Sequence, residues 1–326
     1  MKAFVTGGTG FIGSHLVEAL VQKGYDVTCL VRRTSDLRWL KSLSISYVEG
    51  DLRDEEMLKR GFEGQDYIFH VAGLTKAIYP EEYDQVNHQG TRNLIRAALE
   101  SNMAVERFVY FSSLAAVGPS PSPEPINDSI DPHPVNSYGR SKLEAEEFLI
   151  RNSENLPITI IRPPTVYGPR DRDFYLFFRY AQKGWIPLLW NGDPLLSLVY
   201  VKDLVRAVFM ALETPETIGK VYFVSDRFPY AWSKIVETIA SALQIRPLPI
   251  RIPISFLYLA SLGAEGLSRI RKRNPLLTRE KVREIREKYW ICYPTKAQDD
   301  FGYKSLFSLE EGIAETLQWY LENGWL

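Results

Sequence analysis

Residues 4–13 read FVTGGTGFIG and place glycines at positions 7, 10 and 13. Residues 3–5, at the start of this run, predict a short strand, and the amphipathic segment 11–23 predicts a helix that ends at Gly24. A glycine-rich turn that leads from a strand into a helix is typical of a dinucleotide cradle. A tight turn that binds nothing is the alternative, and the residues beyond the turn must decide between the two.

Each glycine has a distinct role in such a cradle. Gly7 permits the tight turn, Gly10 lets the backbone approach a pyrophosphate, and Gly13 permits close packing of the helix on the strand. The first turn of the helix also offers free backbone N–H groups to phosphate oxygens. We therefore expect the cofactor contacts in this segment to be Gly7, Thr9, Gly10, Phe11, Ile12 and Gly13.

Short β-type runs alternate with longer helical patterns through the N-terminal half. This alternation predicts an α/β fold, with a doubly wound parallel sheet of the Rossmann type and helices on both faces. The further strands are expected at 27–31, 46–49, 67–71, 107–112, 158–161 and 221–224, and the further helices near 54–62, 81–101 and 137–152. We predict an NADP-binding core in residues 1–168 and a smaller, mostly substrate-binding region in 169–326, with 198–224 returning to the Rossmann sheet. The proline-rich segment 118–134 predicts an extended lid or surface loop.

The amino-acid composition limits the kinds of partner that this chain is expected to bind. The 326 residues include 39 Lys and Arg and 40 Asp and Glu, a formal net charge of −1. A small-molecule partner is therefore expected rather than nucleic acid. Cys29 and Cys292 are far apart and form no metal-binding pattern, so we expect no metal and a reducing, cytoplasmic location. No secretory signal is expected before the first strand.

The apolar segment 252–262 is too short and too often interrupted by polar residues to span a bilayer. It predicts a buried or interfacial helix, and no integral membrane segment is expected. The basic residues in 269–273 are interpreted as a solvated face, with contact to a membrane surface as the alternative.

The end of the second strand bears on the choice between NAD and NADP. An acidic residue there would accept hydrogen bonds from ribose hydroxyls and favour NAD. This chain has Arg32 and Arg33, followed by two hydroxyl residues, and planar guanidinium groups match a 2′-phosphate. We therefore prefer NADP, with NAD possible, Arg32 as the first candidate and Arg33 as the second; a solvated basic pair is the alternative. Asp51 and Leu52 follow the third strand and are expected to border the adenine, although a helix cap explains Asp51 nearly as well.

Tyr138 and Lys142 lie four residues apart on a predicted helix and so share one face. Tyrosine ionises near pH 10, and a neighbouring ammonium favours the phenolate, which makes this pair a candidate acid/base. Ser112 and Ser113 end the predicted strand 107–112 and should face the same crevice, because ligands bind at the carboxyl ends of parallel strands. A serine hydroxyl there can donate to a substrate oxygen.

Together these motifs resemble the extended short-chain dehydrogenases/reductases of the NAD-dependent epimerase/dehydratase superfamily. The resemblance covers essentially the whole chain. Its motifs are TGGTGFIG, GDLRD at 50–54, HVAG at 70–73, VNHQGTRNLIRAA at 86–98, SSLAAVG at 112–118, YGRSK at 138–142 and IRPPTVYGPRD at 161–171. Within the superfamily, the sequence resembles the dihydroflavonol-reductase, 3β-hydroxysteroid-dehydrogenase and hopanoid-associated epimerase-like branches.

The resemblance implies a Ser–Tyr–Lys site and hydride transfer at a carbinol carbon. It implies Tyr138 as acid/base, Lys142 as the group that tunes it and binds the nicotinamide ribose, and Ser113 as the hydroxyl that polarises the substrate oxygen, with Ser112 as the alternative. The cofactor contacts it adds are Ala72, Gly73, Asn87, Pro163 and Val166. The resemblance also implies a homodimer formed by the helices 81–101 and 137–152.

Departures from the family pattern favour some reactions over others. Leu114 and Ala115 stand where sugar dehydratases have an Asp–Glu pair, and residues 195–197 lack the arginine that nucleotide-sugar enzymes usually have. An apolar ketone or alcohol is expected to fit among the aromatic residues Tyr175, Phe177, Phe178, Trp185, Trp190, Tyr230 and Trp232, although a core role explains each of them as well. The leading hypothesis is an NADP-dependent dehydrogenase/reductase. The alternatives are a nucleotide-sugar 4-epimerase with tightly bound NAD and a non-catalytic NADP-binding sensor.

Overall fold

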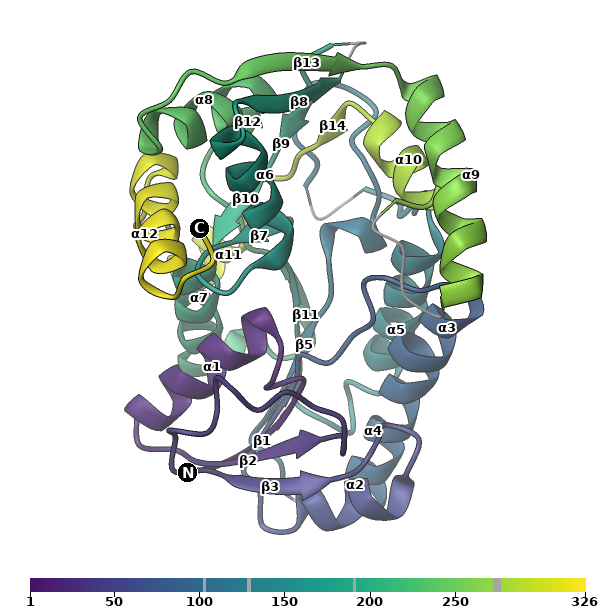
Figure 1. Cartoon of the computed structure of the whole chain (residues 1–326). Helices are drawn as coiled ribbons and strands as arrows, with labels where there is room; N and C mark the ends of the chain where they lie inside the picture. Colours follow the sequence, from purple (N-terminus) through teal and green to yellow (C-terminus); the bar gives the residue numbers. More distant parts are fainter. Residues whose placement is uncertain (102–103, 128–129, 190–191, 272–276) are drawn as a thin grey trace.

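The computed structural model describes residues 1–101, 104–127, 130–189, 192–271 and 277–326 (Figure 1). Seven parallel strands form one sheet in the order β11-β6-β5-β4-β1-β2-β3. The chain starts at the centre of the sheet and winds outward to both edges, which confirms the predicted Rossmann-type fold class. The strands are β1 (Lys2–Thr6), β2 (Asp26–Val31), β3 (Ser46–Glu49), β4 (Tyr67–His70), β5 (Arg107–Phe111), β6 (Ile158–Arg162) and β11 (Lys220–Phe223).

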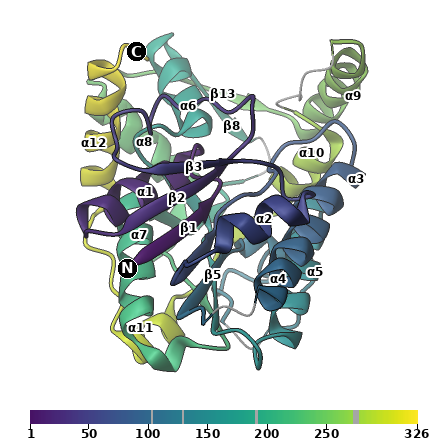
Figure 2. The ribbon, with the colours of Figure 1, turned by 90° about the horizontal axis from the view of Figure 1, so that it is seen from below.

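Helices cover both faces of this sheet (Figure 2). Successive side chains of a strand point to opposite faces, so β1 sends Val5 to one core and Phe4 to the other. Each face is apolar because both are covered, as expected of a parallel sheet. The helices are α1 (Phe11–Gln22), α7 (Val201–Glu213) and α11 (Thr295–Phe301) on the Val5 face, and α2 (Glu55–Phe62), α4 (Gly90–Glu100) and α5 (Ser137–Arg151) on the Phe4 face.

The predicted helix 81–101 contains an irregularity. It begins as α3 (Glu81–Tyr83), continues as a π-helical segment over Asp84–Gln89, and becomes α4. The buried side chain of Asn87 lies in the π-helical segment. Single π-helical turns inside longer helices often occur at functional sites, because they redirect one side chain.

Most of the remaining elements pack beyond the carboxyl edge of the sheet, where several of them form a second core. Its small sheets pair β7 (Thr165–Tyr167) with β10 (Leu198–Tyr200), β8 (Trp185–Leu189) with β13 (Leu248–Ile252), and β9 (Leu195–Leu196) with β12 (Tyr230–Ala231) and β14 (Tyr289–Trp290). Its helices are α6 (Arg172–Gln182), α8 (Trp232–Ala242) and α12 (Leu309–Glu322), whereas α9 (Ile254–Arg271) and α10 (Arg279–Arg286) pack against each other outside this core. Within 198–224, β11 joins the main sheet and α7 packs against α1, whereas β10 pairs with β7 outside the main sheet.

The aromatic residues expected around a substrate pack mainly against one another. Phe178 is fully buried, the rings of Phe177 and Trp232 lie 4.8 Å apart, and the Tyr175 hydroxyl donates to the carbonyl of Trp325. Trp190 lies outside the described residues. For the residues that can be placed, the core interpretation is the correct one, because α6, α8 and α12 need large apolar side chains to close the second core.

The described part of the proline-rich segment 118–134 is tied to the C-terminal region. The N–H of Ser120 donates to the carbonyl of Tyr289, and Ile126 forms a bridge with Cys292. Ser120 and Ile126 are both buried. The described part of the segment is therefore anchored at Ser120 and Ile126 and is not a free lid there.

Candidate active site

The carboxyl ends of the parallel strands bring the predicted residues to one edge of the sheet. Gly7 follows β1, Arg32 follows β2 and Ala72 lies two residues beyond β4. Ser113 and Pro163 lie just beyond β5 and β6. Segments far apart in the sequence thus meet at one crevice, as the parallel topology requires.

The glycine-rich turn has the close backbone packing of a dinucleotide cradle. Gly7 has φ +73°, and a Cβ there would lie 2.5 Å from the N atom of Ala72. A Cβ on Gly13 would lie 2.1 Å from the carbonyl oxygen of Gly7. Among the described residues no side chain caps α1 at Gly10, so the first N–H groups of the helix are free to bind phosphate oxygens. The turn therefore fits a dinucleotide pyrophosphate, with Thr9, Phe11 and Ile12 partly buried beside it.

Arg170 braces this end of α1, a role that its sequence position did not predict. Its guanidinium donates to the hydroxyl of Ser14 at 3.0 Å and to the carboxylate of Glu18 at 2.5 Å, and it lies over the ring of Trp39. Arg170 has φ +73°, which is uncommon for a residue with a side chain. The turn that contains Arg170 is thus held in a strained backbone conformation against α1.

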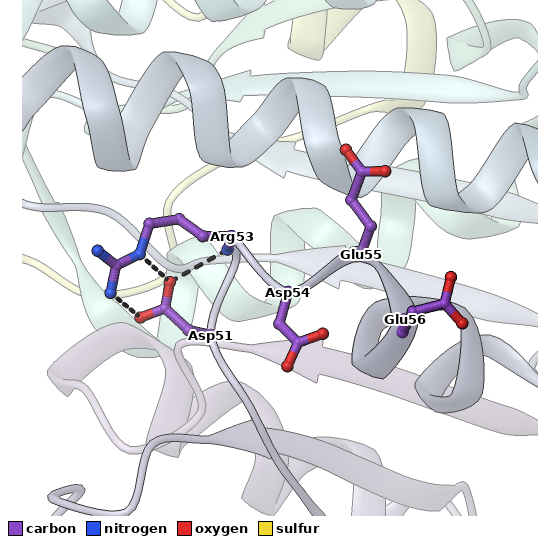
Figure 3. A pocket seen from close by; sticks show the side chains of 5 residues that line it. All are labelled: Asp51, Arg53, Asp54, Glu55 and Glu56. Carbon is purple, nitrogen blue, oxygen red and sulfur yellow. Dashed lines mark hydrogen bonds and ion pairs between the residues drawn. The ribbon is translucent and has the colours of Figure 1, made fainter.

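The adenosine end of the predicted site carries both charge signs. Arg32 and Arg33 are exposed, and neither forms an ion pair among the residues that the structure describes. The Asp51 carboxylate is occupied by Arg53, whose Nε lies 2.7 Å from it (Figure 3). This hydrogen bond, more than the charge of Arg32, lowers the pKa of Asp51. An adenine amine would therefore compete with Arg53 for Asp51, a partner that the motif did not reveal.

Three further carboxylates lie close to Asp51. Asp54, Glu55 and Glu56 line the same shallow hollow as Asp51 (Figure 3). Asp54 is the N-cap of α2 and accepts from the N–H of Met57, while the two glutamates lie in the first turn, where they favourably oppose the helix dipole. The hollow is thus built by a helix start, and its negative charge disfavours a phosphate there. Leu52 is buried against Gly90 in the core, with little surface to cover an adenine.

Three of the predicted residues lie close together: Gly73, Asn87 and Lys142. A Cβ on Gly73 would lie 3.2 Å from Nζ of Lys142 and 3.4 Å from Oδ1 of Asn87. The Asn87 amide bonds both backbone polar groups of Leu74 and donates to the hydroxyl of Ser141. Asn87 therefore fixes the loop after β4 to α5, which carries Lys142.

His70 joins this arrangement to β1 through a directional chain of hydrogen bonds. The N–H of Ala72 donates to the hydroxyl of Thr6, which lies 2.7 Å from Nδ1 of His70; Nε2 of His70 lies 2.8 Å from the hydroxyl of Thr91. Because the Thr91 hydroxyl donates to the carbonyl of Asn87, it must accept from His70, which assigns the proton of His70 to Nε2. Burial, helped by the charge of Lys142, lowers the pKa of His70 to about 3, so the ring is neutral.

Replacing Thr91 by valine tests this chain. Thr91→Val leaves the buried N–H of His70 without an acceptor and should lower the free energy of unfolding by about 1–3 kcal/mol. Thr316→Val is a matched control, because the buried hydroxyl of Thr316 makes the same bond to a carbonyl four residues earlier and receives none from a histidine in the described structure. Urea unfolding of both variants measures the difference. Equal losses in the free energy of unfolding would contradict the proposed chain of hydrogen bonds.

Tyr138 contacts Ser113, not Ser112. The side chain of Ser113 acts on the phenol of Tyr138 and lowers its pKa, and the Ser113 hydroxyl accepts from the N–H of Ala115. Ser112 is buried, and its hydroxyl has no partner among the described residues. Lys142 lies one helical turn beyond Tyr138, with its Nζ 2.7 Å from the carbonyl oxygen of Phe111 and 4.7 Å from the ring centre of Tyr110. One hydroxyl, one phenol and one amine therefore share the crevice.

Burial dominates the acid–base properties of this group. It raises the pKa of Tyr138 to about 12, with the Ser113 hydrogen bond acting in the opposite direction. Burial lowers the pKa of Lys142 to about 7, and the negative Glu146 partly opposes that shift. Lys142 is not among the groups that shift the pKa of Tyr138, so the expected lowering is not seen; burial disfavours the charged forms of both side chains.

Two carboxylates of α10 hold the first turn of α5. The carboxylate of Glu280 accepts from the N–H and the hydroxyl of Ser137, and Glu284 accepts from the side chain of Asn136, the N-cap. A carboxylate at a helix N-terminus is favourable, and here it also fixes the turn that carries Tyr138. The charge of Glu284 contributes to the raised pKa of Tyr138. Nothing in the local YGRSK motif indicated these distant partners.

Two remaining predicted contacts lie at the far side of the crevice. The carbonyl of Pro163 accepts from the N–H of Leu114, next to Ser113. Val166 lies in β7, paired with Val199 of β10, and is partly buried where the two cores meet. The structure thus brings Pro163 beside the Ser113 turn and leaves Val166 one small strand away.

Asp84, His88 and Glu144 form a further polar group on the outer side of α5. Nδ1 of His88 lies 2.8 Å from the Asp84 carboxylate and 3.5 Å from that of Glu144. The group is partly exposed, and such charged surface groups are common without an ion, so we assign it no metal. None of the helices in the described ranges is long and apolar enough to cross a membrane.

Comparison with known proteins agrees with this geometry. Residues 3–225 match the NAD dependent epimerase/dehydratase family. The chain belongs to that family. The predicted resemblance to extended short-chain dehydrogenases/reductases is confirmed, as is the prediction of an enzyme of the oxidoreductase kind that binds a nicotinamide dinucleotide.

Members of the family with full-length similarity show the range of reactions. The chain is 31% identical to the ceramide reductase of Caulobacter vibrioides, covering 99% of this chain and 95% of that protein. It is 30% identical to a 3-beta-hydroxysteroid dehydrogenase of Mycolicibacterium neoaurum, with 98% and 92% covered. The UDP-glucose 4-epimerase of Thermotoga maritima has the same fold, with a TM-score of 0.82 at 24% identity over 99% of each chain.

Proposed function

We propose that this enzyme transfers hydride between NADP(H) and a secondary alcohol or ketone of an apolar molecule. The observation that carries the proposal is the grouping of three side chains at one crevice: Tyr138 and Lys142 lie one turn apart on α5, and the Lys142 amine lies 2.7 Å from the carbonyl oxygen of Phe111, at the end of the strand that leads to Ser113. We further propose that residues 1–168 hold the cofactor and that most of 169–326, apart from 198–224, surrounds the substrate. The ceramide and the hydroxysteroid in the relatives' names are apolar molecules, which supports this substrate class.

A bound nicotinamide supplies the hydride donor or acceptor, and the side chains manage the oxygen and its proton. In reduction, the Ser113 hydroxyl donates a hydrogen bond to the carbonyl oxygen and stabilises its growing negative charge. Tyr138 gives its phenolic proton to that oxygen, and the ammonium of Lys142 stabilises the phenolate that remains. Oxidation of the alcohol runs through the same steps in reverse, with Tyr138 as base.

Sugar chemistry is less well supported. Leu114, which follows Ser113, is buried and apolar, so it cannot supply the acid or base that dehydration needs. A nucleotide-sugar 4-epimerase is the competing reaction and would need no net redox. The test is to incubate the purified enzyme with NADPH and a panel of long-chain and steroid ketones, and to analyse its bound nucleotides. Turnover of an apolar ketone with NADPH supports the proposal. Copurified NAD together with interconversion of a UDP-sugar would contradict it, and binding without any turnover would favour a sensor.

Arg32 is the proposed contact to the 2′-phosphate of NADP. Arg32→Ala should raise the KM for NADPH about ten- to a hundredfold and leave the KM for NADH nearly unchanged, because a charge-assisted hydrogen bond is lost only with the phosphate. Arg38→Ala is the matched control, since Arg38 is a nearby exposed arginine that already pairs with Asp36. Steady-state kinetics with both cofactors decide the point, and an equal loss with NADH and NADPH would remove Arg32 from the phosphate site.

Two further proposals concern the whole molecule. We propose a homodimer through the 81–101 and 137–152 helices, since α4 and α5 lie side by side on one face of the sheet; sedimentation velocity tests it. We also infer a cytoplasmic location, because the chain has only two cysteines, Cys29 and Cys292, and they lie far apart in the sequence.

A further inference from the structure

Helix α9 has its apolar residues on the outside. Phe256 is 63%, Leu259 65% and Ile270 81% exposed. On the opposite side of the helix, Ser261 and Ser268 are buried, and their hydroxyls bond to carbonyls one turn earlier. A surface helix of a water-soluble protein normally shows the reverse distribution, so this helix is built for an apolar partner outside the chain.

The outer face of α9 is continuous and carries no acidic residue. With 3.6 residues per turn, one side of the helix contains Phe256, Leu259, Gly263, Gly266, Leu267 and Ile270. A Cβ on Gly263 or Gly266 would meet no described atom within 4 Å, so this side faces open space. The only acidic residue of α9, Glu265, is turned inward and pairs with Arg279 at 2.9 Å.

The location of α9 leaves this face accessible. Figures 1 and 2 both place α9 at the periphery of the molecule, with α10 between it and the main body. The strand that leads into α9, β13, also exposes Leu248 and Ile250. The apolar exposure therefore begins before the helix and runs along its whole length.

The charges at the ends of α9 indicate which apolar partner fits. Arg251 precedes the helix and Arg271 ends it; both are exposed, and neither forms an ion pair among the described residues. In the sequence, four of the five residues 269–273 are basic. A second copy packed antiparallel on this face would place Arg271 beside Arg251 of its partner, which is repulsive. Anionic lipid headgroups above an apolar layer complement both the charge and the apolar surface.

We propose that α9 binds the surface of an anionic lipid bilayer through its outer face. The helix axis then lies in the plane of the membrane–water interface. Docking does not depend on the proposed reaction. The consequence of docking for catalysis does depend on the proposed reaction. α10 pairs with α9 and, through the bond between Glu280 and Ser137, connects α9 to α5, the helix that carries Tyr138. A docked enzyme would hold its active site next to the layer that contains lipid-like substrates.

Vesicle flotation tests the proposal with the full chain. The wild type should float with vesicles of phosphatidylcholine and phosphatidylglycerol, and much less with phosphatidylcholine alone or at high salt. The double variant Leu259→Asn/Ile270→Asn should lower the partition coefficient tenfold or more. The matched control is Leu306→Asn/Leu321→Asn, which changes two leucines that are 68% and 53% exposed away from α9 and should float like the wild type.

The readouts separate docking from loss of the folded state and from self-association. Both double variants change exposed residues, so their thermal melting and their NADPH binding should match those of the wild type. Failure of the wild type to float with anionic vesicles would overturn the proposal. It would also be overturned if the Leu259/Ile270 variant floated normally, or if that variant only converted a dimer to a monomer in sedimentation, which would make a second copy the partner of α9.

Discussion

Tyr138→Phe is expected to lower kcat for ketone reduction about a hundred- to ten-thousandfold, with NADPH binding unchanged. The substitution removes one oxygen, and with it the proton that would reach the substrate oxygen. The Ser113 hydroxyl loses its partner but remains in place, because it still accepts from the N–H of Ala115. NADPH oxidation with a ketone identified in the panel measures the rate, and nucleotide fluorescence measures binding.

Tyr83→Phe is the matched control for this experiment. The ring of Tyr83 lies 6.1 Å from that of Tyr138, and its hydroxyl accepts from the N–H of Ala77. Its removal should cost some stability and leave the rate within about tenfold of the wild type, because the bond it makes is structural. A Tyr138→Phe enzyme with the rate of the wild type would exclude Tyr138 as the proton donor.

Lys142→Met should abolish most of the activity and yet stabilise the protein near neutral pH. Lys142 is 3% exposed, and burial lowers the pKa of its amine to about 7 from an ordinary value of 10.5. An amine with a lowered pKa in the folded state makes the protein less stable wherever the unfolded chain binds the proton more readily. On this basis methionine, which is similar in length and uncharged, should raise the free energy of unfolding by about 2–4 kcal/mol at pH 6.

The pH dependence gives this prediction its sign. Below about pH 7 the lysine is protonated in both states, and the cost of burying the charge is complete. Between about pH 7 and pH 10.5 the folded protein has released the proton while the unfolded chain retains it, so the stability of the wild type rises relative to that of Lys142→Met. The advantage of the variant should therefore shrink across this range and vanish near pH 10.5.

Urea unfolding at pH 6 and pH 9 measures the change, with Lys41→Met as a control that removes an exposed lysine and should leave activity unaltered. A Lys142→Met enzyme that is less stable than the wild type at both pH values would contradict the assignment of a charge-burial cost. Retained activity would exclude Lys142 from the catalytic group.

Local sequence patterns were sufficient for the sheet and for the cofactor turn. Gly7 and Gly13 show the close backbone packing predicted for this turn: a Cβ on Gly13 would collide with Gly7, six residues earlier, and a Cβ on Gly7 would collide with Ala72 beyond β4. Likewise Tyr138 and Lys142 share a face because helical spacing alone decides it. The strand ends met as predicted because parallel topology permits no other arrangement.

Long-range pairing could not be predicted in the same way. Glu280 of α10 caps α5, a helix more than 140 residues earlier in the chain, and this contact depends on tertiary packing. The sequence left the aromatic residues of α6 and α8 open between a substrate pocket and the core, because core and pocket have the same composition. The apolar segment after β13 was expected to be buried or interfacial, and only the structure shows that its apolar side faces outward.

Transfer of a labelled hydride tests the central claim most directly. The enzyme is incubated with an apolar ketone and NADPH carrying deuterium on the transferable face of the nicotinamide, and the product is analysed by mass spectrometry. We expect deuterium at the new carbinol carbon, one NADP formed for each product molecule, and no transfer by Tyr138→Phe. Tightly bound NAD that copurifies, with UDP-sugar interconversion and no net consumption of NADPH, would contradict the account.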